Sequence, residues 1–209
     1  MVIAILVGVL MAIGLVVIYA IGPSWAQFQN SNGNNYSNDF FFIHQLQSVA
    51  VALLALLAGY FIPFRFFEKI SKGVLIFGLL VCVLMALLGA TGSSLVNCDP
   101  GACRWFKLPM GASFQPVEIL KLGVLMYLAG LIVKRKKEGE LDGKEFLIPM
   151  GVVMGVAIVI VAVLQKDLGS TVVLVAMCLS MLIVSGMKLS RIGMVLGAIA
   201  ALAVPLVVL

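Results

Sequence analysis

The sequence is dominated by uninterrupted apolar blocks, each about as long as a helix that crosses a membrane. Roughly twenty apolar residues are needed to cross a hydrocarbon core about 30 Å thick. The blocks that meet this length, with edges predicted to within a few residues, are 2–22, 42–62, 73–91, 117–133, 146–164, 168–187 and 192–209. The pattern predicts an all-α integral membrane protein, a polytopic bundle with about seven transmembrane helices present.

Composition agrees with lipid as the main solvent of this chain. It is 63% hydrophobic and only 11% charged, whereas soluble domains are about half apolar and a quarter charged. The first block follows directly on Met1 and is long enough to span. A signal peptide has a charged start and a shorter apolar core. We therefore expect a retained helix rather than a cleaved signal.

The basic residues predict the topology. With the N-terminus placed in the cytoplasm, ten of the 14 Lys and Arg residues lie in inner loops and three in outer loops, while Lys121 lies inside a span. The positive-inside rule favours this arrangement. The net charge of +5 does not indicate nucleic acid as a partner, because its basic residues lie in short loops between spans.

The loops differ in what they predict. The outer segment 23–41 contains a long polar run and is expected to be a solvated loop. The outer segment 92–116 contains aromatic residues and arginine, which favours an interfacial or re-entrant piece. The inner segment 63–72 is basic and aromatic and suits a helix in the headgroup layer. The highly charged inner segment 134–145 is expected to be a solvated loop.

The four cysteines suggest at most one disulfide. Cys82 and Cys178 fall inside spans, where a free cysteine behaves as a small apolar residue. Cys98 and Cys103 flank a turn-prone linker that could bring them within bridging distance in an oxidising compartment. Spacing alone does not set the geometry, so the sequence leaves this disulfide open.

Three ionisable residues in or near the spans stand out: Glu118, Lys121 and Asp167. A charge at the centre of a membrane helix costs about 2.5–3.5 kcal/mol on insertion scales, so the presence of each of these residues calls for a structural or functional explanation. Glu118 and Lys121 lie one helical turn apart and can pair. Lys121 could instead reach Asp167 across the bundle, and both arrangements stay open. We predict that Glu118 and Lys121 shape a site, whereas Asp167 suits a structural or a functional role equally.

Other chemistries have little support. The single histidine, His44, has no metal-ligand cluster around it, so we predict no metal site. No phosphate-binding loop of the G-x-x-x-x-G-K-[ST] type occurs, which argues against ATP-driven transport. The glycines within spans are predicted to allow close approach of helices; they are Gly8, Gly14, Gly78 and Gly89.

Three motifs resemble those of the SEDS family, which includes RodA, FtsW and SpoVE. They are Gly101-Ala-Cys-Arg-Trp-Phe-Lys-Leu108, Phe114-Gln-Pro-Val-Glu-Ile-Leu-Lys121 and Gln165-Lys-Asp-Leu-Gly-Ser170. The family has Gly-Ala-x-Arg-Trp, Phe-Gln-Pro-Ser-Glu-x-x-Lys and Gln-Pro-Asp-x-Gly-Thr in the same order. This chain departs from the family at Val117, which replaces a serine that could cap a helix, and at Lys166, which replaces a proline that would stiffen the turn.

The resemblance implies about ten spans in the bacterial cytoplasmic membrane, so residues 1–209 would be one incomplete transmembrane domain, cut in the seventh span. The residues it places at a substrate cavity are Arg104, Trp105, Gln115, Pro116, Glu118, Lys121, Asp167 and Gly169. From the residues alone, we predict that Arg104 and Trp105 are simple interfacial anchors, and a functional role stays open. The family's catalytic Asp follows the seventh span. We therefore expect no catalytic residue in this chain and no activity of the chain alone.

The resemblance also implies a function. It is a peptidoglycan glycosyltransferase that polymerises lipid II outside the cytoplasmic membrane, for elongation or division, together with a class B penicillin-binding protein. No cofactor is expected in this chain, and a divalent cation stays open for the full enzyme. Two alternatives remain: a transporter (flippase) of lipid-linked precursor, and a noncatalytic scaffold of the division or elongation machinery.

Overall fold

The computed structural model describes residues 2–33, 35–99, 102–107, 113–141, 143–195 and 197. Within this part of the chain, six helices are long and apolar enough to cross a membrane. The predicted class, a polytopic helical membrane protein, is confirmed. The predicted span 192–209 lies for the most part outside the described residues, after a short helical stretch at 189–195. The chain separates into two compact units, Met1–Pro63 and Phe64–Leu209, and the single domain expected for it stays a prediction.

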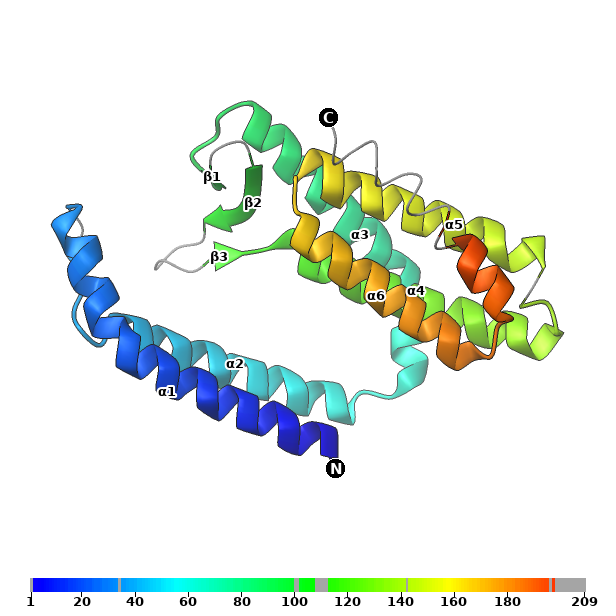
Figure 1. The fold of residues 1–209 in the computed structure, drawn as a ribbon, viewed down its shortest axis with the longest axis horizontal. Coiled ribbons are helices and arrows are strands. Elements are labelled where there is room, and N and C mark those ends of the chain that lie inside the picture. Colours follow the sequence, from blue (N-terminus) through cyan, green and yellow to red (C-terminus); the bar gives the residue numbers. More distant parts are fainter. Residues whose placement is uncertain are drawn as a thin grey trace. The chain divides into compact units, whose positions relative to one another are not determined.

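The first unit is a hairpin of two long helices, α1 (Val2–Ser31) and α2 (Phe40–Phe61), drawn in blue and cyan in Figure 1. The helix α2 has no buried residue among those described, which suits helices whose apolar sides face lipid. The close helix approach predicted at Gly8 and Gly14 is not made within this hairpin, because a Cβ added at either glycine meets no atom within 4 Å, and toward other helices it stays a prediction.

The helix α1 extends into the segment 23–41, which the sequence predicted to be a loop. Pro23 lies inside the helix; it removes one backbone hydrogen bond, which membrane helices tolerate. Apolar residues also recur past it, at Trp25, Ala26 and Phe28. The polar turn that follows is held by Asn30, whose side chain donates to the Tyr36 carbonyl at 2.9 Å and accepts from the Tyr36 amide at 2.7 Å.

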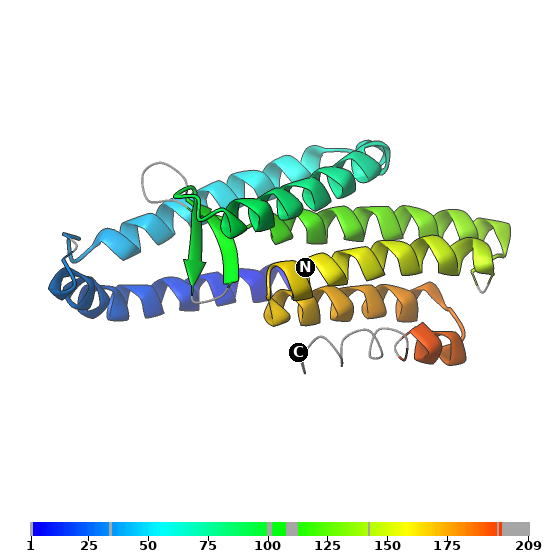
Figure 2. The ribbon, with the colours of Figure 1, turned by 90° about the horizontal axis from the view of Figure 1, so that it is seen from above.

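The second unit contains the remaining helices and a small sheet. Its helices are α3 (Phe64–Ala90), α4 (Pro116–Glu138), α5 (Lys144–Ile158), the π-helical continuation η2 (Val159–Leu164) and α6 (Leu168–Ser185). The helix α4 contacts α3, α5 and α6, and α4, α5 and α6 run side by side in Figure 2. Two predictions are corrected: the segment 63–72 forms the first turns of α3 rather than a separate helix, and the segment 134–145 is helical at both ends.

The helices α3 and α4 touch through their backbones. A Cβ on Gly78 of α3 would lie 2.8 Å from the Cα of Leu120, and a Cβ on Gly123 of α4 would lie 2.7 Å from the Cα of Leu75. Both distances are shorter than real Cβ contacts, so only glycine allows this crossing. The close approach predicted for Gly78 is confirmed, and Gly123 adds the matching position on the other helix.

The interior of the second unit is filled by apolar side chains spaced about one helical turn apart. They include Leu120, Val124 and Leu128 of α4, Phe146, Met150 and Met154 of α5, and Leu174, Cys178 and Leu182 of α6. This spacing places them on one face of each helix. Cys82 and Cys178 are both buried and unbridged, as packing residues are expected to be.

A three-stranded antiparallel sheet connects α3 to α4, and the sequence did not predict it. Its strands, in spatial order, are β1 (Val96–Asp99), β2 (Ala102–Lys107) and β3 (Ser113–Phe114). Val96 pairs with Phe106, and Phe106 pairs with Phe114, so three apolar residues line up across the strands. Such cross-strand pairs stabilise a sheet.

The hairpin of β1 and β2 is closed by a disulfide between Cys98 and Cys103. Gly89, near the end of α3, leaves room for it, because a Cβ there would lie 2.6 Å from the Sγ of Cys103. The disulfide therefore packs directly on α3. The close approach predicted at Gly89 is made by this hairpin and not by another helix.

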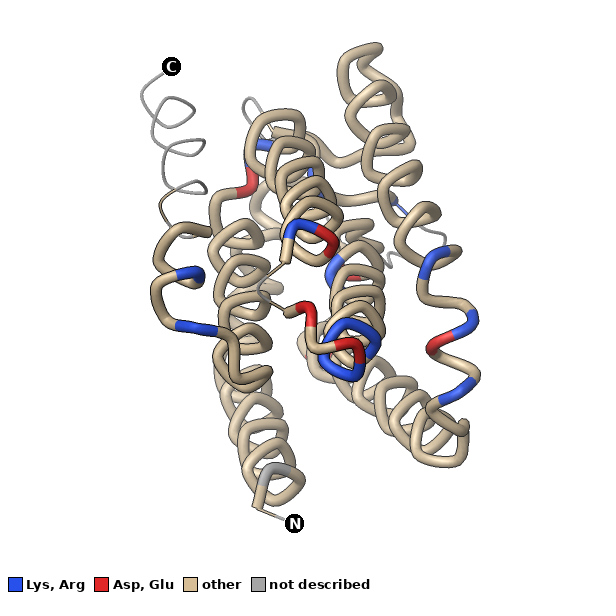
Figure 3. Tube along the Cα trace, turned by 90° about the vertical axis from the view of Figure 1, so that its right-hand side faces the viewer, with Lys and Arg blue, Asp and Glu red and all other residues tan. Residues whose placement is uncertain are grey.

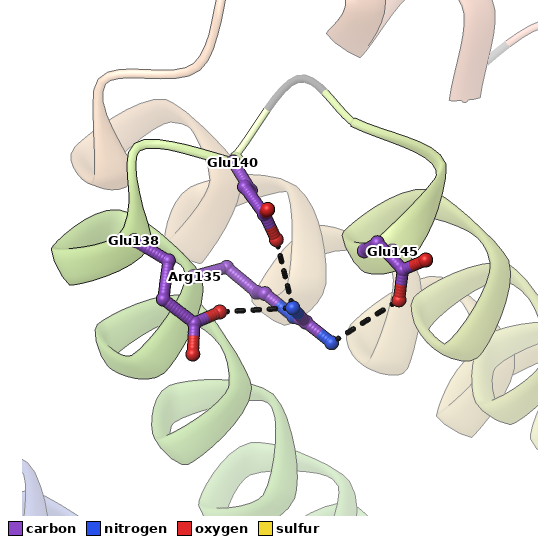
Figure 4. Close-up of polar contacts among 4 residues, drawn as sticks. All are labelled: Arg135, Glu138, Glu140 and Glu145. Carbon is purple, nitrogen blue, oxygen red and sulfur yellow. Dashed lines mark hydrogen bonds and ion pairs between the residues drawn. The ribbon is translucent and has the colours of Figure 1, made fainter.

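The connection between α4 and α5, at the segment 134–145, is organised around one arginine (Figure 4). One guanidinium nitrogen of Arg135, Nη1, lies 2.8 Å from the carboxylates of both Glu138 and Glu140, and the other, Nη2, lies 3.5 Å from that of Glu145. Single exposed ion pairs contribute about 0–1 kcal/mol, but a planar guanidinium can hold several carboxylates at once. The segment is solvent-exposed, as predicted, but it is ordered by this ionic cluster.

The neighbouring residue ties this connection to the end of α6. The ammonium group of Lys136 donates to the carbonyl of Ser185 at 2.8 Å, next to Gly186, whose positive φ of 85° ends α6. A cation at the carbonyl end of a helix is favourable. Arg135 and Lys136 therefore both make contacts within the protein, at the end of α4, where charged residues gather in Figure 3.

The helix crossing leads to a first prediction. Gly123→Ala should destabilise the protein by about 1–3 kcal/mol, because the added methyl group would press on the α3 backbone. Gly151→Ala is the control, since a Cβ there meets no atom within 4 Å, and it should be neutral or stabilising through helix propensity. Thermal unfolding in detergent, followed by circular dichroism, measures both. Equal melting temperatures for the two variants would contradict the crossing.

Candidate functional site

The turn between η2 and α6 holds the carboxylate of Asp167. Asp167 is the N-cap of α6, and its Oδ1 accepts from the amide of Ser170 at 3.0 Å. Its carbonyl accepts from the hydroxyl of Thr171 at 2.7 Å. The residue is only 6% exposed. A carboxylate at a helix N-terminus satisfies free amides and complements the helix dipole, so Asp167 has a structural role in the fold.

The second oxygen of this carboxylate links α6 to α4. The side-chain amide of Gln115 donates to Oδ2 of Asp167 at 3.0 Å. Gln115 immediately precedes α4, and Pro116 occupies the buried first position of that helix. Proline is suited to this position because its missing N–H would have no partner there. The contact across the bundle that the sequence left open for Lys121 is therefore made by Gln115.

Lys121 pairs on its own helix. Its ammonium lies 2.7 Å from the carboxylate of Glu118, one turn earlier. The Lys121 side chain is 16% exposed, whereas that of Glu118 is 58% exposed. A pair with one partner so open to solvent is weak, about 0–1 kcal/mol. The structure thus brings Glu118 and Lys121 together, but it joins neither of them to Asp167.

Arg104 connects the sheet to the same turn. From β2, its guanidinium donates to the carbonyl of Lys166 at 2.8 Å, while its buried Nε has no partner among the described residues. Trp105 is the next residue of the strand and so points to the opposite side; it is 38% exposed. Arg104 therefore belongs with Gln115 and Asp167, and Trp105 does not.

The backbone of Lys166 explains one departure from the SEDS motif. Its φ is 50°, which makes it the one non-glycine residue with positive φ in the described part of the chain. The left-handed region costs an ordinary residue about 1–2 kcal/mol, and proline cannot enter it because its ring holds φ near −65°. The family's proline is therefore incompatible with the turn seen here.

Gln165 is a site residue that the sequence analysis did not select. It is fully buried; its Nε2 lies 3.4 Å from the carbonyl of Cys82, and its Oε1 has no partner among the described residues. It follows η2, and π-helical segments are frequent at functional sites. Its presence in the third motif was the available signal. Gly169, which the sequence did select, is exposed in the first turn of α6.

A hollow of about 600 Å³ lies beside this region, between the sheet and the end of α3. Its lining includes Gly89, Cys103, Lys107 and Leu164. It does not include Glu118, Lys121 or Asp167, so this hollow differs from the polar cavity predicted around them. Within the described residues, no three His, Cys, Asp or Glu side chains are grouped so that they could hold a metal.

The cap of α6 gives a second prediction. Asp167→Ala should destabilise the protein by about 1–3 kcal/mol, because it removes the cap and leaves the Gln115 amide without its partner. Asp167→Asn should cost less, since an amide oxygen can still cap the helix and Gln115 can turn its own oxygen toward the new amide. Thermal unfolding in detergent compares the two variants. A larger loss for asparagine than for alanine would refute this arrangement.

The strained turn gives a third prediction. Lys166→Pro should lower stability by about 1–3 kcal/mol, whereas Lys166→Gly should leave it unchanged or raise it, because only glycine adopts positive φ without strain. Lys166→Ala is the matched control that removes the charge and keeps the strain. The midpoint of thermal unfolding orders the three variants, and a stable proline variant would show that the turn has negative φ.

Comparison with known proteins adds to this geometry. The chain matches the family model FTSW_RODA_SPOVE, described as "Cell cycle protein", over residues 1–209. A relative from Marinobacter nauticus, named "Probable peptidoglycan glycosyltransferase FtsW", is 37% identical over 177 residues, which are 84% of this chain and 41% of that protein. One of the same name from Aeromonas salmonicida is 33% identical over 197 residues, 92% of this chain and 45% of that protein. The chain spans less than half of these relatives.

Solved structures show the same fold. The chain is similar to the rod shape determining protein RodA of Thermus thermophilus, with a TM-score of 0.57 and 25% identity, over 91% of this chain and 58% of that one. It is also similar to a chain in a structure described as "Structural coordination of polymerization and crosslinking by a peptidoglycan synthase complex", with a TM-score of 0.56 and 24% identity over 91% and 52% of the two chains.

Proposed function

The chain belongs to the FtsW/RodA/SpoVE family of cell cycle proteins, and we propose from this premise that its residues serve a peptidoglycan glycosyltransferase. The protein is a multi-pass membrane protein of that family. We place it in the bacterial cytoplasmic membrane with its N-terminus in the cytoplasm. The ten-to-three bias of basic residues supports this orientation.

The observation that carries the proposal is the meeting of all three motifs at one turn. Arg104 of the first motif and Gln115 of the second both bind the Lys166–Asp167 turn of the third, across 62 and 52 residues of sequence. Residues so far apart are held together only by the tertiary fold. We assign to this junction the role of fixing the outer ends of α4 and α6, and with them Lys121, in one arrangement.

Near this junction, Lys121 is the residue that we assign to binding the diphosphate of a lipid-linked substrate. In transfer of a glycosyl group from such a substrate, a base takes a proton from the incoming hydroxyl while the diphosphate leaves with its negative charge. A cation near the diphosphate stabilises that charge. Lys121 can exchange its weak pair with Glu118 for a phosphate, because charge-assisted bonds to phosphate are stronger than an exposed ion pair.

The remaining parts of the reaction are assigned by resemblance. We place the catalytic carboxylate outside residues 1–209, so that this chain alone would hold lipid II without polymerising it. A divalent cation in the whole protein would supply further charge compensation at the diphosphate. As partner we propose a class B penicillin-binding protein, and the similarity to a chain of a peptidoglycan synthase complex supports a synthase partner.

Binding of lipid II by the purified chain in detergent tests the assignment of Lys121. Lys121→Gln should weaken binding about tenfold or more, because a bond between charged groups is worth about 1.5–3 kcal/mol. Glu118→Gln should leave binding unchanged or strengthen it, since it removes the competing carboxylate. Lys144→Gln, at the other end of the second unit, is the control. Unchanged affinity in Lys121→Gln would rule out this role.

A further inference from the structure

Two adjoining hollows lie along the α3–α4 pair, at the end away from Gln115. One, of about 470 Å³, is lined mainly by polar and charged side chains of the first turns of α3 and the last turns of α4. The other, of about 540 Å³, is an apolar groove that continues from it along α4. The two share lining residues, among them Glu68, Gly130 and Lys137, so they form one continuous surface with a charged end and an apolar length.

The apolar groove is as long as one leaflet of a membrane. Its floor on α4 runs from Leu122 to Val133, a rise of about 16 Å at 1.5 Å per residue, which is about half of a 30 Å hydrocarbon core. Leu125 and Met126 lie on the same helix face between these two residues. Phe64 and Phe67 of α3 form the facing wall near the charged end.

The charged end holds more cations than carboxylates. Lys72, Lys134 and Lys137 line it, and none of the three forms an ion pair with another described residue. Of its two carboxylates, Glu138 is bound to Arg135, which leaves Glu68. The excess of positive charge is therefore available to an anion from outside the protein.

We propose that this composite surface binds an anionic glycerophospholipid, with its phosphate among the three lysines and one acyl chain along the groove. Juxtamembrane lysines attract anionic lipids by about 1 kcal/mol each. A small soluble anion would satisfy the lysines but leave the groove unused, and an apolar helix would fill the groove but leave the lysines unpaired. A molecule with an anionic head and an apolar tail matches both parts, independently of the glycosyltransferase role.

The test compares lipids on the purified 209-residue chain by native mass spectrometry. Dioleoyl phosphatidylglycerol should be retained at least tenfold more than dioleoyl phosphatidylcholine, which has the same acyl chains and no net charge. Changing Lys72, Lys134 and Lys137 to Gln should lower this retention, roughly fivefold for each lysine. Lys69→Gln is the matched control, because Lys69 lies on the same part of α3 but lines neither hollow. Equal retention of the two lipids, or an unaffected triple variant, overturns the proposal.

A second variant tests the groove without altering charge. A Cβ on Gly130 meets no atom within 4 Å, so Gly130→Leu should fold and place its side chain in the groove. It should lower retention of phosphatidylglycerol at least fivefold. Retention equal to that of the unaltered chain, or displacement of the lipid by millimolar glycerol phosphate, would show a headgroup site without an acyl groove and so overturn the proposal.

Discussion

The close crossing of α3 and α4 is the contact on which the rest of the second unit depends. Lipid accommodates apolar side chains as well as a protein interior does, so membrane helices are held together by tight packing and not by the hydrophobic effect. Gly78 and Gly123 supply this packing, since each lets the other helix reach its backbone. The helix α4 also contacts α5 and α6, so both of its ends are held in place relative to the other helices of the unit.

Polar groups occupy those two ends, and most of them are paired. At the start of α4, Gln115 binds Asp167; at its end, Arg135 gathers three glutamates. An unpaired polar group costs several kcal/mol when it is buried away from water, which explains the pairing of the buried Asp167. Two exceptions matter for function: Lys121 has only an exposed partner, and three lysines near the other end form no ion pair with any residue that the structure describes. Both proposed binding sites use these remaining cations.

The spans were predictable because their length is set by the membrane. Some of their ends were also close to the prediction, as in α2 and α6, but others were not. Hydropathy reports the thickness of the hydrocarbon layer, whereas a helix stops where its backbone hydrogen bonds stop. The helices α1, α3 and α4 therefore continue into segments that are polar or charged. The sheet was missed for a related reason, because strands such as β1 and β2 are short. They are stabilised by pairing with each other, by the disulfide and by the packing of that disulfide against Gly89 of α3.

The sequence by itself determined that this protein is a membrane bundle and which polar residues must be placed within it. Helical periodicity also puts Glu118 and Lys121 on one face, so their pairing could be foreseen as one of two options. Tertiary structure decided the other partnerships: Gln115 with Asp167, Arg104 with the Lys166 carbonyl, and Gly123 with Leu75. These contacts join residues about fifty or more positions apart in the sequence. Which distant residues meet depends on how the helices cross and the strands pair, and no local sequence pattern encodes this.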